Sequence, residues 1–226
     1  AEQVKSERLK ADLITNVSHD IKTPLTSIIN YVDLLKRENI ENPTVQQYLE
    51  ILDQKSQRLK TLTEDLVEAS RASSGNIKLD ITDIDLVELV QQTTGEFEDR
   101  FSARHLELVN SLPNEVILIE ADGRRLWRVL ENLYKYALEN TRVYASVEDL
   151  GSEVVFTIKN ISSSPLNISP EELTERFVRG DVSRTTEGSG LGLSIAKDLT
   201  ALQGGKLEIT IDGDLFKASV TFPIKN

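Results

Sequence analysis

The sequence of 226 residues contains no cysteine, no methionine and only two histidines, His19 and His105. The lack of cysteine excludes disulfides, thiolate nucleophiles and thiolate-held zinc or iron–sulfur sites. Because the two histidines stand far apart in the chain, a metal site built from clustered histidines is not expected either. His105 follows a predicted helix and precedes a predicted strand, so we interpret it as structural.

Long apolar runs and an excess of positive charge are absent as well. No segment approaches the roughly 20 apolar residues of a membrane-spanning helix, and the N-terminal stretch lacks the apolar core of a signal peptide. The formal charge of −11 argues against binding to nucleic acid. The chain starts without methionine in a charged, helix-favouring stretch. We therefore expect a piece of a longer protein, which meets a membrane only through a missing N-terminal region.

Two long stretches in the N-terminal third carry apolar residues at steps of three and four. The first runs from Ser6 to about Lys36, and the second follows a break at residues 37–44, with Thr44 as its expected N-cap. This spacing predicts two amphipathic helices, which a short turn joins into an antiparallel hairpin. The apolar seams are too long for one hairpin to bury, which favours a homodimeric four-helix bundle.

Residues 71–80 are small and polar, which is typical of a linker, and the apolar period changes after them. Short apolar runs predict strands, and longer periodic stretches predict helices. We expect strands at 77–84, 106–109, 116–119, 142–147, 154–158, 206–211 and 216–222, and helices at 86–101, 123–138 and 191–202. The fold class is therefore α+β, with a hairpin domain at 1–73 and a two-layer α/β sandwich at 74–226.

The segment SHDIKTPLTSI, residues 18–28, holds the first histidine. His19 and Thr23 share a helix face away from the apolar stripe, so we expect His19 to be exposed. An ordinary solvated histidine is the simplest interpretation. However, Asp20 can hold the tautomer of the imidazole and leave the other nitrogen nucleophilic, and Thr23 can position a water molecule. Pro24 removes a helical hydrogen bond, so the helix should bend just past the histidine.

The segment GSGLGLSIAK, residues 188–197, leads from glycines into an apolar helix. Glycines at such a junction let backbone N–H groups approach an anion at the positive end of the helix. This pattern predicts a phosphate-binding turn at Gly188, Gly190, Leu191 and Gly192. A Rossmann dinucleotide site does not fit, because no strand of suitable spacing precedes the glycines. A plain glycine-rich turn is the alternative.

Both segments resemble motifs of two-component sensor histidine kinases: SHDIKTPLTSI their phosphoacceptor box, and GSGLGLSIAK the second glycine box of their catalytic domain. The resemblance implies that ATP phosphorylates His19, with Asp20 as general base, and that Thr23 assists hydrolysis of the phosphorylated partner. It implies a Bergerat-type ATP-binding domain that uses ATP and Mg²⁺. It also implies a response-regulator receiver domain as partner, and the cytoplasmic portion of a membrane-anchored sensor as the location.

The segment EELTERFVRGDVSR, residues 171–184, resembles the phenylalanine box of the same kinases. By this resemblance Phe177 positions the lid over the nucleotide. Arg179 and Arg184 are candidates to meet phosphate, because a guanidinium binds phosphate oxygens in bidentate fashion. A solvated charged loop is an equally good interpretation of Arg184.

The asparagine box of the family departs from its usual form. In residues 131–145, ENLYKYALENTRVYA, Asn132 matches the first asparagine of the box. When the segment is aligned with the family's box from the N-terminal end, Tyr136 stands where the resemblance implies the Mg²⁺ ligand. Matched from the right, Lys135 and Tyr136 fit the terminal Lys-Tyr, and about one helical turn is absent. In either alignment the asparagine that the resemblance implies for Mg²⁺ is missing, so Asn132 is the remaining candidate metal ligand, with Lys135 and Tyr136 as nucleotide contacts.

The first glycine box also departs, because residues 159–169 read KNISSSPLNIS. Asn160 stands where the family has the aspartate that recognises adenine, and an uncharged amide should weaken this recognition without abolishing it. Two functional hypotheses follow. The first is an ATP-dependent protein-histidine autokinase that passes the phosphoryl group to a response regulator, with possible phosphatase activity. The second is an impaired pseudokinase that serves as a dimeric phosphotransfer or phosphatase scaffold, because the asparagine box is short.

Overall fold

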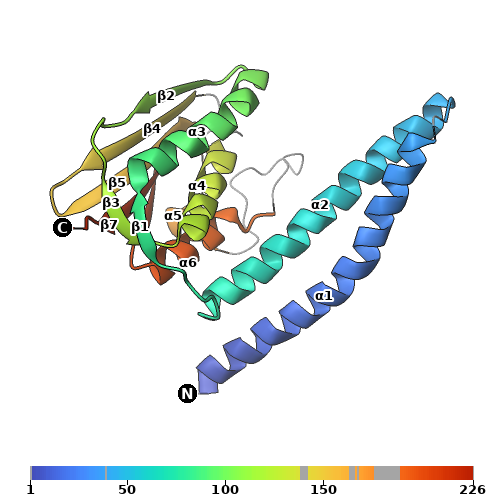
Figure 1. The fold of residues 1–226 in the computed structure, drawn as a ribbon, viewed down its shortest axis with the longest axis horizontal. Coiled ribbons are helices and arrows are strands. Elements are labelled where there is room, and N and C mark those ends of the chain that lie inside the picture. The colour runs from blue at the N-terminus through green and yellow to red at the C-terminus, as the bar shows by residue number, and fades with distance from the viewer. Residues whose placement is uncertain are drawn as a thin grey trace. The chain divides into compact units, whose positions relative to one another are not determined.

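The computed structural model describes residues 2–38, 40–137, 142–162, 166, 168–175 and 189–225, with side chains described at residue 14 and from residue 16 onward. The chain divides into two compact units, residues 1–76 and 77–226. The first unit consists of two long helices, and the second is a sheet with helices on one side (Figure 1). Each unit is described by itself below.

The first unit is an antiparallel hairpin of α1 (Glu2–Arg37) and α2 (Pro43–Ser73), as predicted. The N-cap of α2 is Asn42, whose Oδ1 accepts hydrogen bonds from the N–H groups of Thr44 at 3.0 Å and Val45 at 3.3 Å. The prediction of Thr44 as the N-cap is wrong. Pro43 has no N–H and a fixed φ, which suits the first helical position, so the capping side chain stands one residue before it.

The hairpin buries only part of its apolar stripe. Leu25 and Val32 of α1 and Leu49 of α2 are less than 8% exposed. Many other apolar side chains of the two helices are exposed within the chain: Val17, Ile21, Ile28, Tyr31, Leu34, Leu35, Tyr48, Ile51, Leu52 and Leu59. As predicted, the seams are longer than one hairpin can cover, and a large apolar surface on a helix pair is typical of an interaction site.

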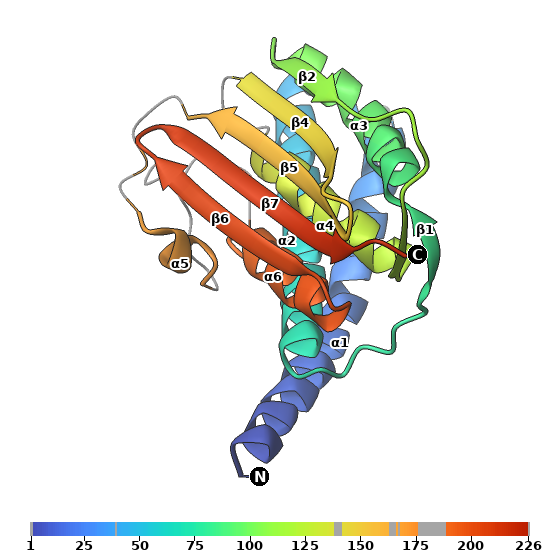
Figure 2. The ribbon, with the colours of Figure 1, turned by 90° about the vertical axis from the view of Figure 1, so that its left-hand side faces the viewer.

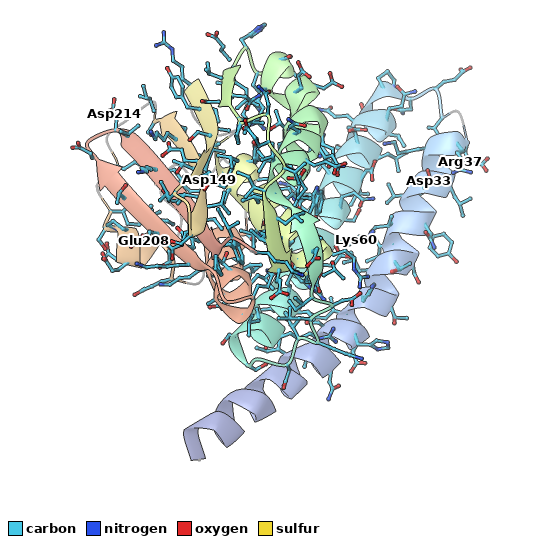
Figure 3. The ribbon with its side chains drawn as sticks, turned by 60° about the vertical axis from the view of Figure 1, so that its left-hand side comes forward. Asp33, Arg37, Lys60, Asp149, Glu208 and Asp214 are labelled. Atoms are coloured by element: carbon cyan, nitrogen blue, oxygen red, sulfur yellow. The ribbon has the colours of Figure 1, made fainter. Side chains whose placement is uncertain are left out.

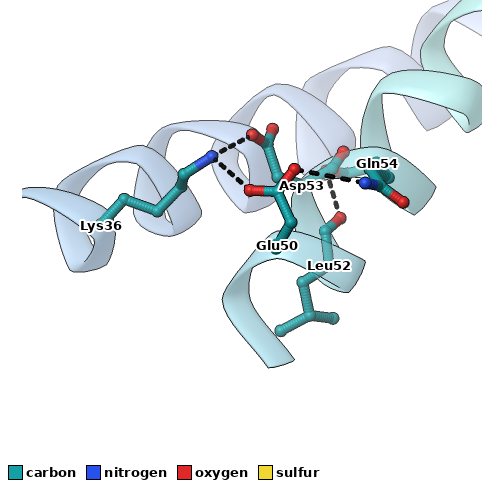
Figure 4. Close-up of polar contacts among 6 residues, drawn as sticks. Lys36, Glu50, Leu52, Asp53 and Gln54 are labelled. Carbon is teal, nitrogen blue, oxygen red and sulfur yellow. Dashed lines mark hydrogen bonds and ion pairs between the residues drawn. The ribbon is translucent and has the colours of Figure 1, made fainter. Parts of the chain in front are cut away.

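Ion pairs at the closed end of the hairpin join its two helices. The Nζ of Lys36 lies 2.7 Å from Asp53 Oδ2 and 3.1 Å from Glu50 Oε2 (Figure 4). Hydrogen bonds with Asp53 and Glu50 raise the pKa of Lys36, and the bond with Lys36 lowers the pKa of Asp53. On the outer side of α1, Asp33 and Arg37 pair at 2.6 Å (Figure 3). Because all these groups are solvated, the pairs stabilise the fold little, and only those of Lys36, which cross from α1 to α2, bear on the register of the two helices.

The second unit is a two-layer sandwich, as predicted. Its elements are β1 (Thr82–Asp85), α3 (Leu86–Ala103), β2 (Glu107–Ser111), β3 (Leu118–Ala121), α4 (Gly123–Ala137), β4 (Arg142–Asp149), β5 (Glu153–Ile161), α5 (Pro170–Leu173), α6 (Gly192–Leu202), β6 (Lys206–Asp212) and β7 (Leu215–Pro223). The five-stranded sheet has the order β2-β4-β5-β7-β6, with β2 and β4 parallel and the other neighbours antiparallel. Figure 2 shows the strands side by side with α4 and α6 behind them.

One local prediction for this unit is wrong, and one short helix was missed. The strand expected at 77–84 is confined to β1, because its partner β3 offers only the four positions from Leu118 to Ala121 before Asp122 opens α4. The short helix α5 was not predicted. Ser169 and Glu172 form a reciprocal capping box at its start, which stabilises a helix too short to show an apolar period.

A buried carboxylate joins three segments of the second unit. Asp122 Oδ1 accepts a hydrogen bond from the N–H of Arg125 at 3.1 Å and so caps α4, while its Oδ2 accepts one from the N–H of Asp80 at 3.0 Å. The N–H of Asp122 donates to Gln203 Oε1, just past the end of α6, at 2.9 Å. Burial raises the pKa of Asp122, but the two backbone hydrogen bonds, together with the charges of Arg125 and Arg124, outweigh this and hold the pKa below its ordinary value. Asp122 therefore fixes the start of α4 against the end of α6.

Aromatic rings fill the space between α3, α4 and the sheet. The ring of Tyr134 lies 5.4 Å from Phe97, 6.3 Å from Phe101 and 6.1 Å from Phe156, measured between centroids. Its hydroxyl is hydrogen-bonded to Thr94 Oγ1 at 2.8 Å, and the residue is 0% exposed. Burial raises the pKa of Tyr134 to about 12.

Replacing Tyr134 by Phe should change how stability depends on alkaline pH. A phenol whose pKa is higher in the folded chain stabilises it fully below pH 10, and this contribution is lost as the pH rises from 10 toward 12. Urea unfolding at pH 9 and pH 11.5 should show that the wild type loses about 2 kcal/mol more than Tyr134→Phe. The exposed Tyr144→Phe is the matched control and should behave as wild type. Equal losses in wild type and Tyr134→Phe would contradict the assignment.

Candidate functional site

The first candidate group is the pair His19 and Asp20 on α1. Both side chains point into solvent, with exposed fractions of 82% and 86%. The Nδ1 of His19 lies 3.9 Å from Asp20 Oδ1, which is an ion-pair distance and longer than a hydrogen bond. As predicted, His19 is exposed, and because Asp20 stands on the Nδ1 side, the Nε2 is available to a reaction partner.

Helix α1 continues through Pro24 as one element, and Figure 1 shows it curving along its length. Pro24 supplies no N–H to the carbonyl of Asp20. Two carbonyls a little further along, those of Lys22 and Thr23, each accept a hydrogen bond from a hydroxyl one turn later: Thr26 Oγ1 lies 2.8 Å from Lys22 O, and Ser27 Oγ lies 3.3 Å from Thr23 O. These hydroxyls supply hydrogen-bond donors to the carbonyls of the exposed face just after the histidine.

The second candidate group begins at the N-terminus of α6. Gly190 has φ 70°, a left-handed conformation that glycine adopts without strain, and α6 starts two residues later at Gly192. Leu191 occupies the N-cap and provides no side-chain hydrogen bond. The first N–H groups of α6 therefore lack a side-chain cap among the described residues. Such N–H groups are available to an anion at the positive end of the helix dipole.

Asn132 of α4 lies against this helix start. The Oδ1 of Asn132 is 3.4 Å from the position that a Cβ on Gly192 would occupy. Asn132 is only 7% exposed, and within the described part of the chain its Nδ2 has no hydrogen-bond partner. Two predicted site residues that are far apart in the sequence are thus brought together, and one of them carries an unpartnered buried amide.

Lys135, one turn beyond, is engaged within α4. Its Nζ lies 2.6 Å from Glu131 Oε1, and Arg128 pairs with the other oxygen of the same carboxylate. Burial raises the pKa of Glu131, but the bonds from Lys135 and Arg128 outweigh this and hold the pKa below its ordinary value. Glu131 was not predicted as part of this region. The i, i+4 spacing of Glu131 and Lys135 was the signal available in the sequence.

Asn160 of β5 lies on the side of the sheet that the helices cover. Its neighbours across the ladder are Val143 of β4 and Phe216 of β7. The ring of Tyr136, from the end of α4, lies on the ring of Phe216 with centroids 4.4 Å apart. Asn160 is 0% exposed, and neither its Nδ2 nor its Oδ1 has a partner among the described residues. The prediction named Asn160 and Tyr136 but missed Phe216.

Comparison with known proteins identifies both units. Residues 9–75 match the His Kinase A (phospho-acceptor) domain, and residues 121–226 match the histidine kinase-, DNA gyrase B- and HSP90-like ATPase family. The chain belongs to the sensor histidine kinases.

Several relatives support this membership. The sensor protein VanS of Enterococcus faecium is 34% identical over 89% of this chain, which covers 54% of VanS. The solved structure of full-length ShkA in complex with AMPPNP has a TM-score of 0.81 at 22% identity, over 95% of this chain and 46% of that one. ThkA in complex with the response regulator protein TrrA has a TM-score of 0.68 at 23% identity, over 99% and 65%. The chain spans about half the length of VanS, and the two structures show that the fold is shared.

The residues present fit the nucleotide of such a kinase. Three buried amide atoms, on Asn132 and Asn160, lack partners among the described residues, and buried polar atoms in folded proteins are almost always paired. The uncapped start of α6 suits phosphate, and the buried amide beside the rings of Tyr136 and Phe216 suits a flat base.

The metal side of the site is less complete. Within the described ranges, no group of three or more His, Asp or Glu side chains is arranged to hold a metal ion. Within the described part of the asparagine box, Asn132 places an amide oxygen beside the α6 N-terminus. Phe177, Arg179, Arg184 and Gly188, which the sequence also predicts as site residues, lie outside the described residues.

Of the helices that the structure describes, none combines the length and apolar character needed to cross a membrane.

Replacing Asn160 by Val should stabilise the ligand-free protein and remove nucleotide binding. An unpartnered buried amide costs about 1–3 kcal/mol, and valine, which is closer to asparagine in volume than leucine is and favours strands, carries no such cost. Urea unfolding should therefore show a gain of that order for Asn160→Val, and calorimetry should show that the variant no longer binds ADP. The matched control is Asn110→Val, at an exposed position of β2, which should not alter ADP binding. A destabilised Asn160→Val would show that the amide is paired in solution.

Proposed function

We propose that this chain is the catalytic core of a sensor histidine kinase, which transfers the γ-phosphoryl group of ATP to His19 and then to a response regulator. Residues 1–73 carry the phosphoacceptor and dimerise, and residues 74–226 bind ATP. One chain combines the two features on which this proposal rests. The segment that matches the phosphoacceptor family carries an exposed His19–Asp20 pair, and the segment that matches the ATPase family carries buried amides without partners among the described residues.

In the first step the Nε2 of His19 attacks the γ-phosphorus of ATP. The N–P bond forms as the bond from the γ-phosphorus to the β–γ bridging oxygen breaks, and ADP leaves. Asp20, on the Nδ1 side of the ring, orients the imidazole and accepts the Nδ1 proton as the ring takes the phosphoryl group. The exposure of His19 supports this role, because the ring must reach a separate nucleotide-binding unit.

In the nucleotide-binding unit, Gly188, Gly190, Leu191 and Gly192 present backbone N–H groups to the phosphates. Asn160 and Tyr136 contact the base, and Lys135, Phe177, Arg179 and Arg184 complete the site. Asn132 would hold Mg²⁺, which neutralises phosphate charge when it is bound. The ShkA structure, solved with the ATP analogue AMPPNP, supports the assignment of ATP.

In the second step a receiver aspartate attacks the phosphohistidine. A carboxylate oxygen bonds to phosphorus, the N–P bond breaks, and His19 regains its Nδ1 proton. In the reverse direction of signalling, Thr23 positions a water molecule for hydrolysis of the phosphorylated receiver. The ThkA–TrrA complex, which has the same fold, supports a response regulator as partner. The chain would be the cytoplasmic portion of a membrane-anchored sensor, which is consistent with its covering only part of VanS.

The short asparagine box favours an alternative, a dimeric phosphotransfer or phosphatase scaffold with an impaired nucleotide site. The comparisons do not support this alternative, since both domain families match. Autophosphorylation separates the two hypotheses, because a scaffold retains His19 but takes no phosphoryl group from ATP.

Incubation with Mg²⁺ and ATP labelled on its γ-phosphate should label the wild type with phosphate that is stable to alkali and labile to acid. His19→Gln should show only background label, because no nucleophilic nitrogen remains at that position. The matched control is His105→Asn, which replaces the other histidine at its φ of 56° with a residue that tolerates this conformation. This variant should be labelled as wild type. Equal labelling of wild type and His19→Gln would refute the proposal, and no labelling of wild type would favour the scaffold.

We also propose that the exposed apolar side chains of the hairpin form the homodimer interface. Ile28 of α1 is 49% exposed, and burying an isoleucine contributes about 1.5 kcal/mol or more for each copy in a dimer. Ile28→Asp should therefore weaken dimerisation by about 100-fold or more, measured by sedimentation equilibrium. Asn30→Asp, at an exposed polar position of the same helix, should leave the dimer unchanged. A wild type that sediments as a monomer of 25.3 kDa would contradict the proposed interface.

A further inference from the structure

We infer that the nucleotide site accepts 6-oxopurine as well as 6-aminopurine nucleotides, because the residue that meets the base is the neutral amide of Asn160. This inference rests on the proposed function, in which the second unit binds ATP.

Asn160 has an unusual environment for an amide. It is 0% exposed, and its cross-strand neighbours Val143 and Phe216 are 0% exposed apolar residues. Neither the donor Nδ2 nor the acceptor Oδ1 has a hydrogen-bond partner among the described residues. A purely structural asparagine would be paired, since an unpaired buried amide destabilises the fold. Both halves of the amide are therefore available to a ligand.

The rings beside Asn160 suit a planar ligand. Tyr136 lies on Phe216 at a centroid distance of 4.4 Å and an interplanar angle of 35°, and Phe216 is the direct partner of Asn160 in the ladder. Flat rings at this spacing stack on other aromatic faces. Since Asn160 is fully covered in this structure, a base reaches its amide only when the side chains above it move aside. Once there, the base meets one donor and one acceptor on the same side chain.

The chemistry of the two base classes matches the two orientations of an amide. Adenine presents an amino donor at position 6 beside an acceptor at N1, whereas a 6-oxopurine presents an oxygen acceptor at position 6 beside an N1–H donor. An amide pairs with the first edge through Oδ1 and Nδ2, and with the second after a turn of about 180° about its terminal bond. An ionised carboxylate is acceptor-only, so it would face the 6-oxo oxygen with a second acceptor and reject it. With Asn160 in place of a carboxylate, the site would therefore not discriminate between 6-amino and 6-oxopurines.

The test compares the binding of ADP and inosine diphosphate, with Mg²⁺, to the whole chain by calorimetry. Inosine diphosphate is the probe because it differs from ADP only at position 6 and N1, and it lacks the 2-amino group of guanine. The wild type should bind both within about ten-fold of each other. Asn160→Asp should bind ADP and prefer it over inosine diphosphate by about 100-fold or more. Asn160→Ser, whose hydroxyl both donates and accepts, should keep the small ratio at weaker affinity, and circular dichroism checks that each variant folds.

The outcomes separate this inference from the proposed function. A wild type that binds ADP but binds inosine diphosphate at least 100-fold more weakly overturns the inference and leaves the ATP site intact. A wild type that binds neither nucleotide overturns the ATP site and the inference together. A folded Asn160→Asp with the ratio of the wild type shows that another residue reads position 6, and it overturns the role of Asn160.

Discussion

The packing of α4 against α6 is the constraint on which the second unit depends. At one end, Asp122 caps α4 and donates its N–H to Gln203 just after α6, and at the other, Asn132 lies against Gly192 at the start of α6. The two helices are therefore antiparallel, with their register fixed at both ends. The close approach at Gly192 brings an amide to the uncapped turn of α6. A shift of either helix would separate Asn132 from the turn that we propose for phosphate binding.

This arrangement has a cost to the fold that a bound nucleotide would offset. Three buried amide atoms remain unpaired among the described residues, and the first turn of α6 lacks a side-chain cap. Each feature would destabilise an isolated domain. A nucleotide that pairs with these groups binds the folded state only, so it stabilises the protein in proportion to its concentration over its dissociation constant. The free energy that these unpaired groups cost the ligand-free domain is thus recovered when a nucleotide binds, and it contributes to the affinity for the nucleotide.

The sequence predicts the elements with regular periods and the residues with local motifs. The hairpin followed from apolar residues at steps of three and four, and the exposure of His19 followed from its place off that stripe. Asn132, Asn160 and the α6 glycines could be named because they belong to short motifs. Contacts between distant segments could not be predicted. Phe216 becomes the partner of Asn160 only through the pairing of β5 with β7, and the length of β1 depends on where β3 ends.

Competition between neighbouring side chains explains other features that the sequence motifs did not predict. Thr44 has the side chain of a good N-cap, but Pro43 before it prefers the first helical position and leaves the cap to Asn42. Lys135 is a predicted nucleotide contact, and Glu131, one turn before it, also pairs with it at 2.6 Å. In each case a neighbour a few residues away adds to what the side chain does. A motif match considers each position alone and does not weigh such neighbours.

The short asparagine box affects the proposed metal ligands and leaves the other residues of the proposed site in place. In the alignment that lacks about one turn, the following residues are rotated by only about 40° and the helix is about 6 Å shorter, so the faces of α4 are kept. Tyr134 still enters the aromatic core, and Tyr136 still reaches Phe216. What is lost is a second polar side chain beside Asn132. In the proposed site, base recognition and phosphate binding rest on Asn160 and on backbone N–H groups, which do not depend on that turn. Nucleotide binding and phosphoryl transfer would therefore be separable in this chain, with the proposed metal ligand Asn132 bearing on the second.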